Sequence, residues 1–242
     1  MSSRIRIKMC GTTNREDALA AVAAGVDALG FIFYENSPRN IDSEEAKRII
    51  DELPPFVDTV GVFVDRDREE VEEIIRYCRL GYAQLHGQES AKYCERLARF
   101  AAPCQVIKAL RVGKKIKAED VSSYSEHVKG FLLDTYQKDV IGGTGRCFDW
   151  SLIAELHLQK TCILAGGLDV DNVAEALEAV QPYAVDVNSG VEKSPGIKDH
   201  DKIYAFVSKV RAFKAGRVSW INANLLEKLT SEKGNYDETI SN

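Results

Sequence analysis

Short apolar runs alternate with longer segments of helical periodicity eight times along this chain of 242 residues. The runs are rich in β-branched and aliphatic side chains, which is typical of strands buried on both faces. They comprise Ile5–Cys10, Ala28–Phe33, Thr59–Val64, Tyr82–Leu85, Cys104–Leu110, Gly130–Asp134, Cys162–Ala165 and Tyr183–Val187. A succession of strand-then-helix units predicts a parallel sheet that is covered by its helices.

The segments between the runs carry apolar residues at the i, i+3, i+4 spacing of an amphipathic helix, as in Ala18–Ala23 and Val71–Cys78. Asn14 and Ser43 are expected N-caps, because such side chains accept hydrogen bonds from amides of the first turn. Eight such units in this length predict an α/β fold, a single-domain (β/α)8 TIM barrel with a C-terminal extension. A doubly wound parallel sheet stays open, since one sequence does not give the strand order.

The barrel is expected to occupy residues 1–214 as the catalytic domain, with its last helix at Asp199–Phe213. The apolar pattern changes after Gly216. Residues 215–242 are therefore expected to form a tail, with one extra amphipathic helix at Trp220–Leu229 and a frayed polar end. That helix packs either on the barrel or on a second subunit, and both arrangements stay open.

Composition narrows the classes of partner. The net charge of −5 without a basic cluster argues against nucleic acid, and no apolar run approaches the ~20 residues of a membrane span. The six cysteines are widely spaced and no apolar secretory signal begins the chain, so a cytoplasmic protein with free thiols is expected. No cluster has metal-ligand spacing and no GxGxxG follows the first run, so neither a metal nor a dinucleotide is expected.

Two neighbouring strand ends carry glycine turns, at the end of a barrel where active sites form. Gly166 and Gly167 follow the seventh run, and Ser189 and Gly190 follow the eighth. Glycine turns present backbone N–H groups to anions, and barrels often bind phosphate at these two loops. The four residues are therefore expected to bind phosphate, and glycines that only form turns are the alternative.

A thiol and a carboxyl group end the first and sixth runs. Closing the sheet would bring Cys10 and Asp134 to one mouth, where they can act as base and acid. Lys8 points the same way as Cys10, since strand side chains alternate, and its ammonium favours the thiolate. Arg39 can hold a carboxylate by two parallel hydrogen bonds, and His86 is expected in the pocket wall. The alternatives are a buried thiol for Cys10, a helix cap or turn residue for Asp134 and a solvated loop arginine for Arg39. For Lys8 the alternative is a core residue paired with a carboxylate, and for His86 it is a structural histidine.

Eight motifs in order resemble the phosphoribosylanthranilate isomerase family over roughly residues 4–213. They are Ile7–Asn14, Gly30–Phe33 with Ser37–Arg39, Val60–Val64, Gln84–Gly87, Leu132–Thr135, Gly142–Gly145 with Phe148–Trp150, Ala165–Leu168, and Val185–Val187 through Gly190–Glu192. Met9 and Asn188 stand where Ile and Ser are common in the family. Neither departure changes the proposed acid or base.

The resemblance implies a cofactor-free isomerase of tryptophan biosynthesis. Its reaction is the Amadori rearrangement of N-(5′-phosphoribosyl)anthranilate to 1-(2-carboxyphenylamino)-1-deoxyribulose 5-phosphate. The resemblance implies that Cys10 is the general base, Asp134 the general acid, Arg39 a ligand of the anthranilate carboxylate and Asp186 a pocket carboxylate of open role. The expected partner is the small-molecule substrate, the expected state is a monomer or homodimer, and Gly142–Gly145 is a candidate lid.

Three other functions stay open. An isomerase of histidine biosynthesis performs the same rearrangement, but that family carries Asp where this chain has Cys10. A barrel that binds a sugar phosphate without turnover would not need the Cys10 and Asp134 pair. A fragment of a bifunctional enzyme would use the tail as an interface.

Overall fold

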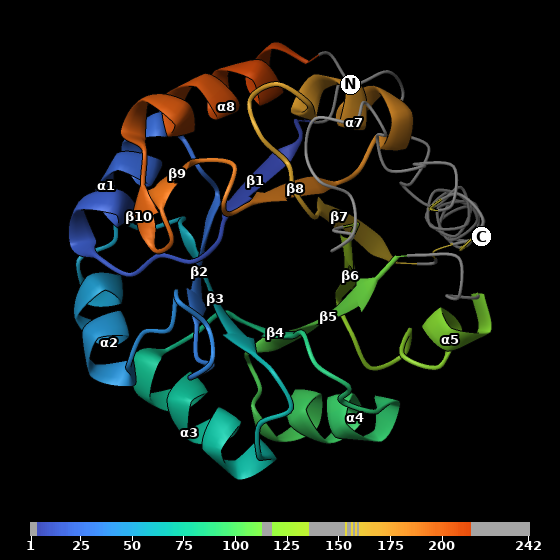
Figure 1. Cartoon of the computed structure of the whole chain (residues 1–242). Helices are drawn as coiled ribbons and strands as arrows, with labels where there is room; N and C mark the ends of the chain where they lie inside the picture. The colour runs from blue at the N-terminus through green and yellow to red at the C-terminus, as the bar shows by residue number, and fades with distance from the viewer. Residues whose placement is uncertain are drawn as a thin grey trace, which may run out of the picture.

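The computed structural model describes residues 4–112, 118–135 and 160–213, together with Ile153, Leu156 and Leu158. Eight parallel strands form a closed barrel in the order β1 to β8 (Figure 1). The strands are β1 (Arg6–Met9), β2 (Ala28–Ile32), β3 (Asp58–Phe63), β4 (Tyr82–Leu85), β5 (Gln105–Arg111), β6 (Gly130–Asp134), β7 (Thr161–Ala165) and β8 (Ala184–Val187). The predicted barrel is confirmed, and the doubly wound alternative is wrong because β1 pairs with both β2 and β8.

Helices surround the barrel, as Figure 1 shows. They are α1 (Arg15–Ala24), α2 (Ser43–Asp51), α3 (Arg68–Cys78), α4 (Ala91–Phe100), α5 (Ala118–Ser122), α7 (Val173–Val180) and α8 (His200–Ala212). Asn14 is confirmed as an N-cap, because its side chain accepts from the Asp17 amide at 2.8 Å. Ser43 is not one: Asp42 caps α2 by accepting from the Glu45 amide at 2.8 Å, and Ser43 is the first helical residue.

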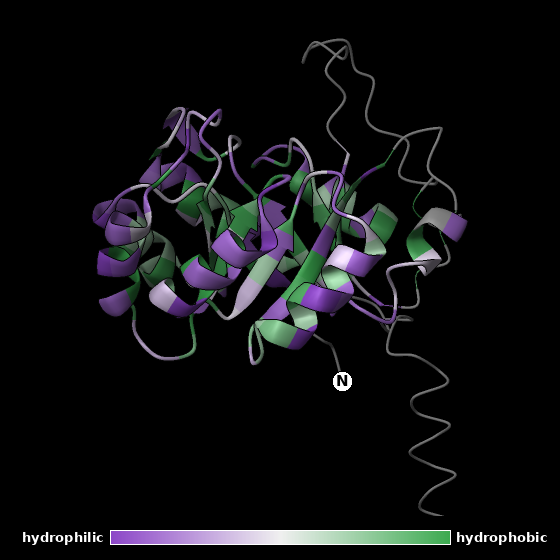
Figure 2. Cartoon of the chain, turned by 90° about the horizontal axis from the view of Figure 1, so that it is seen from below, coloured by the Kyte–Doolittle hydropathy of each residue, from purple (hydrophilic) through white to green (hydrophobic). Residues whose placement is uncertain are grey.

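Strand side chains alternate between two buried environments. Ile7 and Met9 of β1 belong to the larger apolar cluster, between the barrel and the helices. A smaller cluster fills the barrel interior, and it comprises Ile107, Ala109, Leu132, Ile163, Ala165 and Ala184. Figure 2 shows apolar residues concentrated on the strands and hydrophilic residues on the outer helices. This pattern leaves the interior positions near the strand ends free for polar groups.

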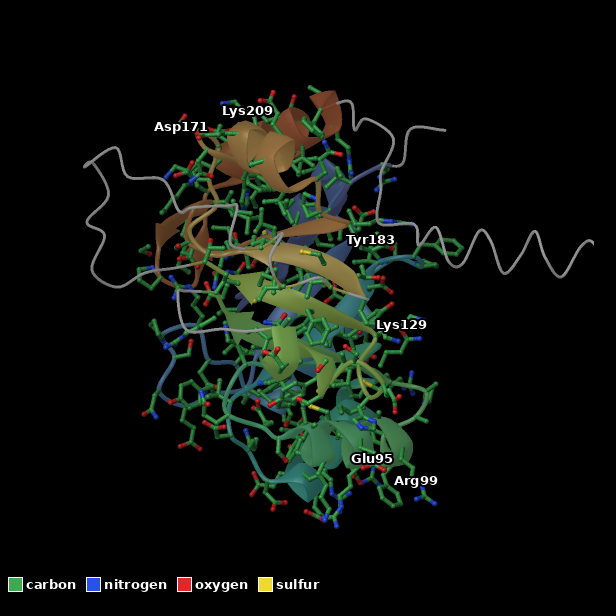
Figure 3. All side chains as sticks on the ribbon, turned by 90° about the vertical axis from the view of Figure 1, so that its right-hand side faces the viewer. Glu95, Arg99, Lys129, Asp171, Tyr183 and Lys209 are labelled. Atoms are coloured by element: carbon green, nitrogen blue, oxygen red, sulfur yellow. The ribbon has the colours of Figure 1, made fainter. Side chains whose placement is uncertain are left out.

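The barrel interior is hollow at the end where the strands begin. A cavity of about 340 Å³ is lined there by residues at the starts of the strands, including Arg6, Asp58, Tyr82, Lys129 and Tyr183. Figure 3 shows Lys129 and Tyr183 on the same edge of the barrel. The predicted catalytic residues Cys10 and Asp134 come at the opposite, carboxyl ends of β1 and β6. The cavity therefore lies toward the other end of the barrel from Cys10 and Asp134, and Lys8 is the one predicted site residue that lines it.

A buried ion pair fixes the loop that follows β4. Lys108 Nζ lies 2.7 Å from Glu89 Oε2, and the two side chains are 3% and 2% exposed. Lys108 also donates to the carbonyl oxygens of Leu85 and Gly87 at 3.2 and 2.8 Å. Glu89 Oε1 accepts from the amide of Asp65 at 2.9 Å, so the pair joins the loops after β3 and β4 to β5.

Removing one partner of this pair should destabilise the fold strongly. Lys108→Met leaves the Glu89 carboxylate buried without its cation, so we expect the free energy of unfolding to fall by about 3–5 kcal/mol. Urea unfolding followed by circular dichroism measures this change. In the double variant Lys108→Met/Glu89→Gln the two losses should not add, because both substitutions remove the same interaction. Additive losses would show that the two groups are not coupled.

Several predictions concern residues outside the described part of the chain. The tail at 215–242, its expected helix at Trp220–Leu229 and the candidate lid at Gly142–Gly145 all lie there, and the division at residue 214 stays a prediction. None of the helices in the described ranges is long and apolar enough to cross a membrane. The sequence reasoning missed a hairpin of β9 (Glu192–Ser194) and β10 (Ile197–Lys198), which lies between β8 and α8 in the chain.

Candidate active site

Cys10 and Lys8 point together into the barrel from β1, as the strand alternation predicts. The position facing them on β2 is Gly30. A β-carbon placed on Gly30 would lie 2.9 Å from Cys10 Sγ and 3.1 Å from Lys8 Nζ. A side chain at this position would therefore displace the thiol or the ammonium. The Cys10 amide donates to the Val187 carbonyl oxygen at 2.8 Å, which fixes the end of β1 against β8.

Lys8 forms a buried ion pair across the seam between β1 and β8. Its Nζ lies 2.8 Å from Asp186 Oδ1, and the side chains are 5% and 8% exposed. The two residues are register partners. Burial opposes the charge on Lys8, but Asp186 and Cys10 together raise its pKa above the ordinary value. Burial raises the pKa of Asp186, and the nearby ammonium groups of Lys8 and Lys198 oppose that rise. Asp186 thus has a definite role as the counter-ion of Lys8.

The Cys10 thiol is buried, and burial decides its ionisation. Burial raises the pKa of Cys10 above its ordinary value, and Asp186 adds to the rise. Lys8 and Lys198 lower it, which is the direction predicted for Lys8, but they do not outweigh burial. In the free protein the thiol is therefore mainly protonated at neutral pH. A thiolate with a raised pKa is a stronger base once it forms.

This balance predicts a thiol that titrates at alkaline pH. The thiolate absorbance near 240 nm, taken as wild type minus Cys10→Ser, should rise with a midpoint above the ordinary value of about 8.5. Lys8→Met should move the midpoint higher, because the substitution removes a nearby positive charge. A midpoint near or below neutral pH would show that the ammonium groups outweigh burial.

Asp134, at the end of β6, lies beside His86. His86 Nε2 is 3.4 Å from Asp134 Oδ2, and Gln84 Nε2 is 3.1 Å from His86 Nδ1. With this amide orientation Nδ1 accepts from Gln84, so neutral His86 carries its proton on Nε2, facing Asp134. The sequence reasoning saw no acid–base partner beside His86. The closed barrel supplies one, because it brings the ends of β4 and β6 together.

Arg39 is held from one side by Glu192. Arg39 Nε and Nη2 donate to the two Glu192 carboxylate oxygens at 2.8 and 2.7 Å. Lys198 Nζ lies 3.1 Å from Glu192 Oε1 and donates to the Asn188 carbonyl and side-chain oxygens at 3.2 and 3.0 Å. Glu192 ends the last of the eight motifs, and neither Glu192 nor Lys198 was given a role from the sequence. The only local sign of a role is that both residues are charged and follow closely after β8 in the sequence.

The two glycine loops predicted to bind phosphate lie side by side. Gly166 and Gly167 have φ values of +96° and +70°, a conformation that favours glycine. Gly190 pairs with Asp169 of the other loop, and a β-carbon on Gly190 would lie 2.0 Å from the Leu168 oxygen. Space is open above Gly167, where a β-carbon would meet nothing within 4 Å. The arrangement leaves room for an anion at the ends of β7 and β8.

The structure thus gathers the predicted residues at the carboxyl ends of the strands. Cys10, Lys8 and Asp186 form one group, Asp134 and His86 a second, Arg39 a third and the glycine loops a fourth. Among the described residues, no three His, Cys, Asp or Glu side chains are arranged to hold a metal ion.

The comparisons with known proteins agree on one family. A family model described as N-(5'phosphoribosyl)anthranilate (PRA) isomerase matches residues 7–209. The N-(5'-phosphoribosyl)anthranilate isomerase of Trichlorobacter lovleyi is 48% identical over 208 residues, which cover 86% of this chain and 98% of that protein. Its counterpart in Pseudomonas fluorescens strain Pf0-1 is 51% identical over 209 residues, covering 86% and 100%.

Two solved structures extend this similarity to the fold. Phosphoribosyl anthranilate isomerase from Thermotoga maritima has a TM-score of 0.75 at 42% identity, covering 86% of this chain and 100% of that one. A phosphoribosyl anthranilate isomerase in complex with reduced 1-(o-carboxyphenylamino)-1-deoxyribulose 5-phosphate has a TM-score of 0.74 at 41% identity, with the same coverage. The family match ends before the tail.

Proposed function

Since this chain belongs to the N-(5′-phosphoribosyl)anthranilate isomerase family and catalyses that isomerisation in tryptophan biosynthesis, we propose how its own residues carry it out. Cys10 is the general base and Asp134 the general acid. One observation supports this best: the two groups end β1 and β6 of one closed barrel, each beside a polar partner. Cys10 also argues against an isomerase of histidine biosynthesis, because that family carries Asp at this position.

The reaction begins at the acid. Asp134 protonates the furanose ring oxygen, and the bond from that oxygen to C1′ breaks to give an iminium ion. Cys10, in the minor fraction that has lost its thiol proton to solvent, then removes the proton from C2′ as a thiolate, which yields an enolamine. The enolamine becomes the ketone when C1′ gains a proton and the C2′ hydroxyl loses one. His86 positions Asp134. The Lys8 ammonium favours the thiolate form of Cys10, and Asp186 opposes it.

The remaining predicted residues bind the two ends of the substrate. The loops of Gly166–Gly167 and Ser189–Gly190 bind the phosphate through backbone N–H groups, and their open geometry supports this role. Arg39 binds the anthranilate carboxylate. Binding at both ends positions the sugar and uses interactions remote from the reacting carbons.

The protein is further proposed to act in the cytoplasm as a monomer or a homodimer, with no cofactor. The five described cysteines are all free thiols, which is typical of a reducing compartment. One related structure is described as monomers generated from a dimeric enzyme of Thermotoga maritima, so both states have a precedent.

Loss of substrate fluorescence tests the whole proposal. Phosphoribosylanthranilate is generated in the cuvette, and the wild-type protein should remove its fluorescence rapidly without an added metal or cofactor. Adding a chelator, or dialysing the protein against one beforehand, should leave the rate of fluorescence loss unchanged. No turnover by the wild-type protein would overturn the proposal and would direct the next assay to the histidine-pathway substrate.

A further inference from the structure

Glu192 connects Arg39, the proposed ligand of the anthranilate carboxylate, to the segment after β8 that leads into the proposed phosphate loop. Its carboxylate accepts from Arg39 on the β2–α2 loop, from Lys198 Nζ on β10 and from the Gly196 amide at 3.2 Å. The side chains of Arg39, Glu192 and Lys198 are 19%, 5% and 0% exposed. These three residues are called the Glu192 network below.

The geometry of the guanidinium decides what Arg39 can still bind. Glu192 occupies the side edge, formed by Nε–H and one N–H of Nη2. The end edge, formed by Nη1 and the second N–H of Nη2, has no hydrogen-bond partner among the described residues. A planar guanidinium can accept one carboxylate at each edge. Arg39 therefore presents its end edge to a second carboxylate, in a plane that Glu192 fixes.

Packing against Gly11 and the charge on Glu192 hold this orientation. A β-carbon on Gly11 would lie 2.8 Å from Arg39 Cδ and 2.7 Å from Asn188 Oδ1, so the arginine stem packs closely on the end of β1. Burial acts against the charge on Glu192, but Arg39 and Lys198 lower its pKa below the ordinary value. The Glu192 carboxylate is thus ionised at neutral pH. A charged acceptor holds the guanidinium by strong hydrogen bonds.

We propose that Glu192 is a positioning residue that sets the preference of this enzyme for a carboxylate on the aromatic ring of its substrate. Glu192 does so without touching the substrate, by fixing the free edge of Arg39. Lys198 forms a second ion pair with Glu192, and its hydrogen bonds to Asn188 join the network to the residue between β8 and the Ser189–Gly190 loop. This inference rests on the proposed role of Arg39.

The test compares two probes that differ in one group. The first is reduced 1-(2-carboxyphenylamino)-1-deoxyribulose 5-phosphate, and the second is the same compound without the ring carboxylate. Isothermal titration gives the dissociation constant of each. The wild-type protein should prefer the first probe by about 10- to 100-fold, the range for a charge-assisted pair. In Glu192→Gln the preference should fall below about threefold, while affinity for the second probe changes by less than about threefold.

Arg39→Gln and the double variant separate the possible failures. Arg39→Gln should also lose the preference, and Arg39→Gln/Glu192→Gln should lose no more than Arg39→Gln alone. If Arg39→Gln keeps the preference, the proposed carboxylate site is wrong. If Arg39→Gln loses it and Glu192→Gln keeps it, or if Glu192→Gln weakens both probes equally, the positioning role is wrong.

Glu192→Asp keeps the test decisive if Glu192→Gln fails to fold. The shorter carboxylate retains the charge but reaches only part of the guanidinium edge, so an intermediate preference is expected. A wild-type preference in Glu192→Asp would overturn the proposal. Thermal unfolding of each variant is measured beside the titration.

Discussion

Replacing Cys10 by serine is expected to lower kcat by about 10²–10⁴-fold with little change in stability. A hydroxyl fits the space that Gly30 leaves for the thiol, but it is a far weaker acid, so its anion is much scarcer at any pH than the thiolate of Cys10. Loss of substrate fluorescence measures kcat, and urea unfolding measures stability.

A matched thiol gives the control for this prediction. Cys78 ends α3, is also buried, and its thiol donates to the Ser43 carbonyl oxygen at 3.4 Å. Burial raises the pKa of Cys78 to about 11, so it is also a protonated thiol. Cys78→Ser should keep kcat within a few fold of wild type, since Cys78 is remote from the strand ends. Full turnover by Cys10→Ala would show that the base is another group.

Asp134→Asn is expected to lower kcat by about 10²–10⁴-fold, because an amide has the shape of the carboxyl group but no proton to give to the ring oxygen. The phosphate and carboxylate contacts do not involve Asp134, so KM should change by only a few fold. Steady-state kinetics by the fluorescence assay separates the two constants. The expected signature is a loss in kcat with a nearly constant KM.

His86 supplies the comparison for Asp134. His86→Asn removes the neighbour at 3.4 Å but leaves the acid in place, so its loss of kcat should be smaller than that of Asp134→Asn. Equal losses in the two variants would mean that His86 itself transfers the proton. A wild-type kcat in Asp134→Asn would contradict its assignment as the acid.

The fold was predictable because its signals are local. Each strand is a short apolar run, and each predicted strand end lies within one residue of the observed one, as with Ile5–Cys10 against Arg6–Met9. The N-cap at Ser43 was wrong for a similarly local reason. Asp42 and Ser43 are adjacent and are about equally good N-caps, so the sequence pattern does not decide between them.

The site was only partly predictable because its contacts are not local. The strand ends gave the positions of Cys10, Asp134 and the glycine loops without any knowledge of their partners. The partner of Lys8 is 178 residues away, and that of Arg39 is 153 residues away. No periodicity reports such a pair. The balance between burial and Lys8 at the thiol also depends on how much protein surrounds the sulfur, which spacing does not give.

The seam between β1 and β8 has a consequence for how this enzyme gains its activity during folding. The Lys8–Asp186 pair crosses this seam. The contact of Asp17 with the Lys198 amide and that of Arg211 with the Ile5 carbonyl oxygen join the segments beside it at the start and the end of the barrel. The three contacts span 178, 181 and 206 residues of chain, and such distant contacts form late because loop closure carries an entropy cost. A refolding chain therefore acquires its strands and helices before the seam closes. Catalytic activity returns only with closure, so it reports the last step of assembly rather than the content of secondary structure.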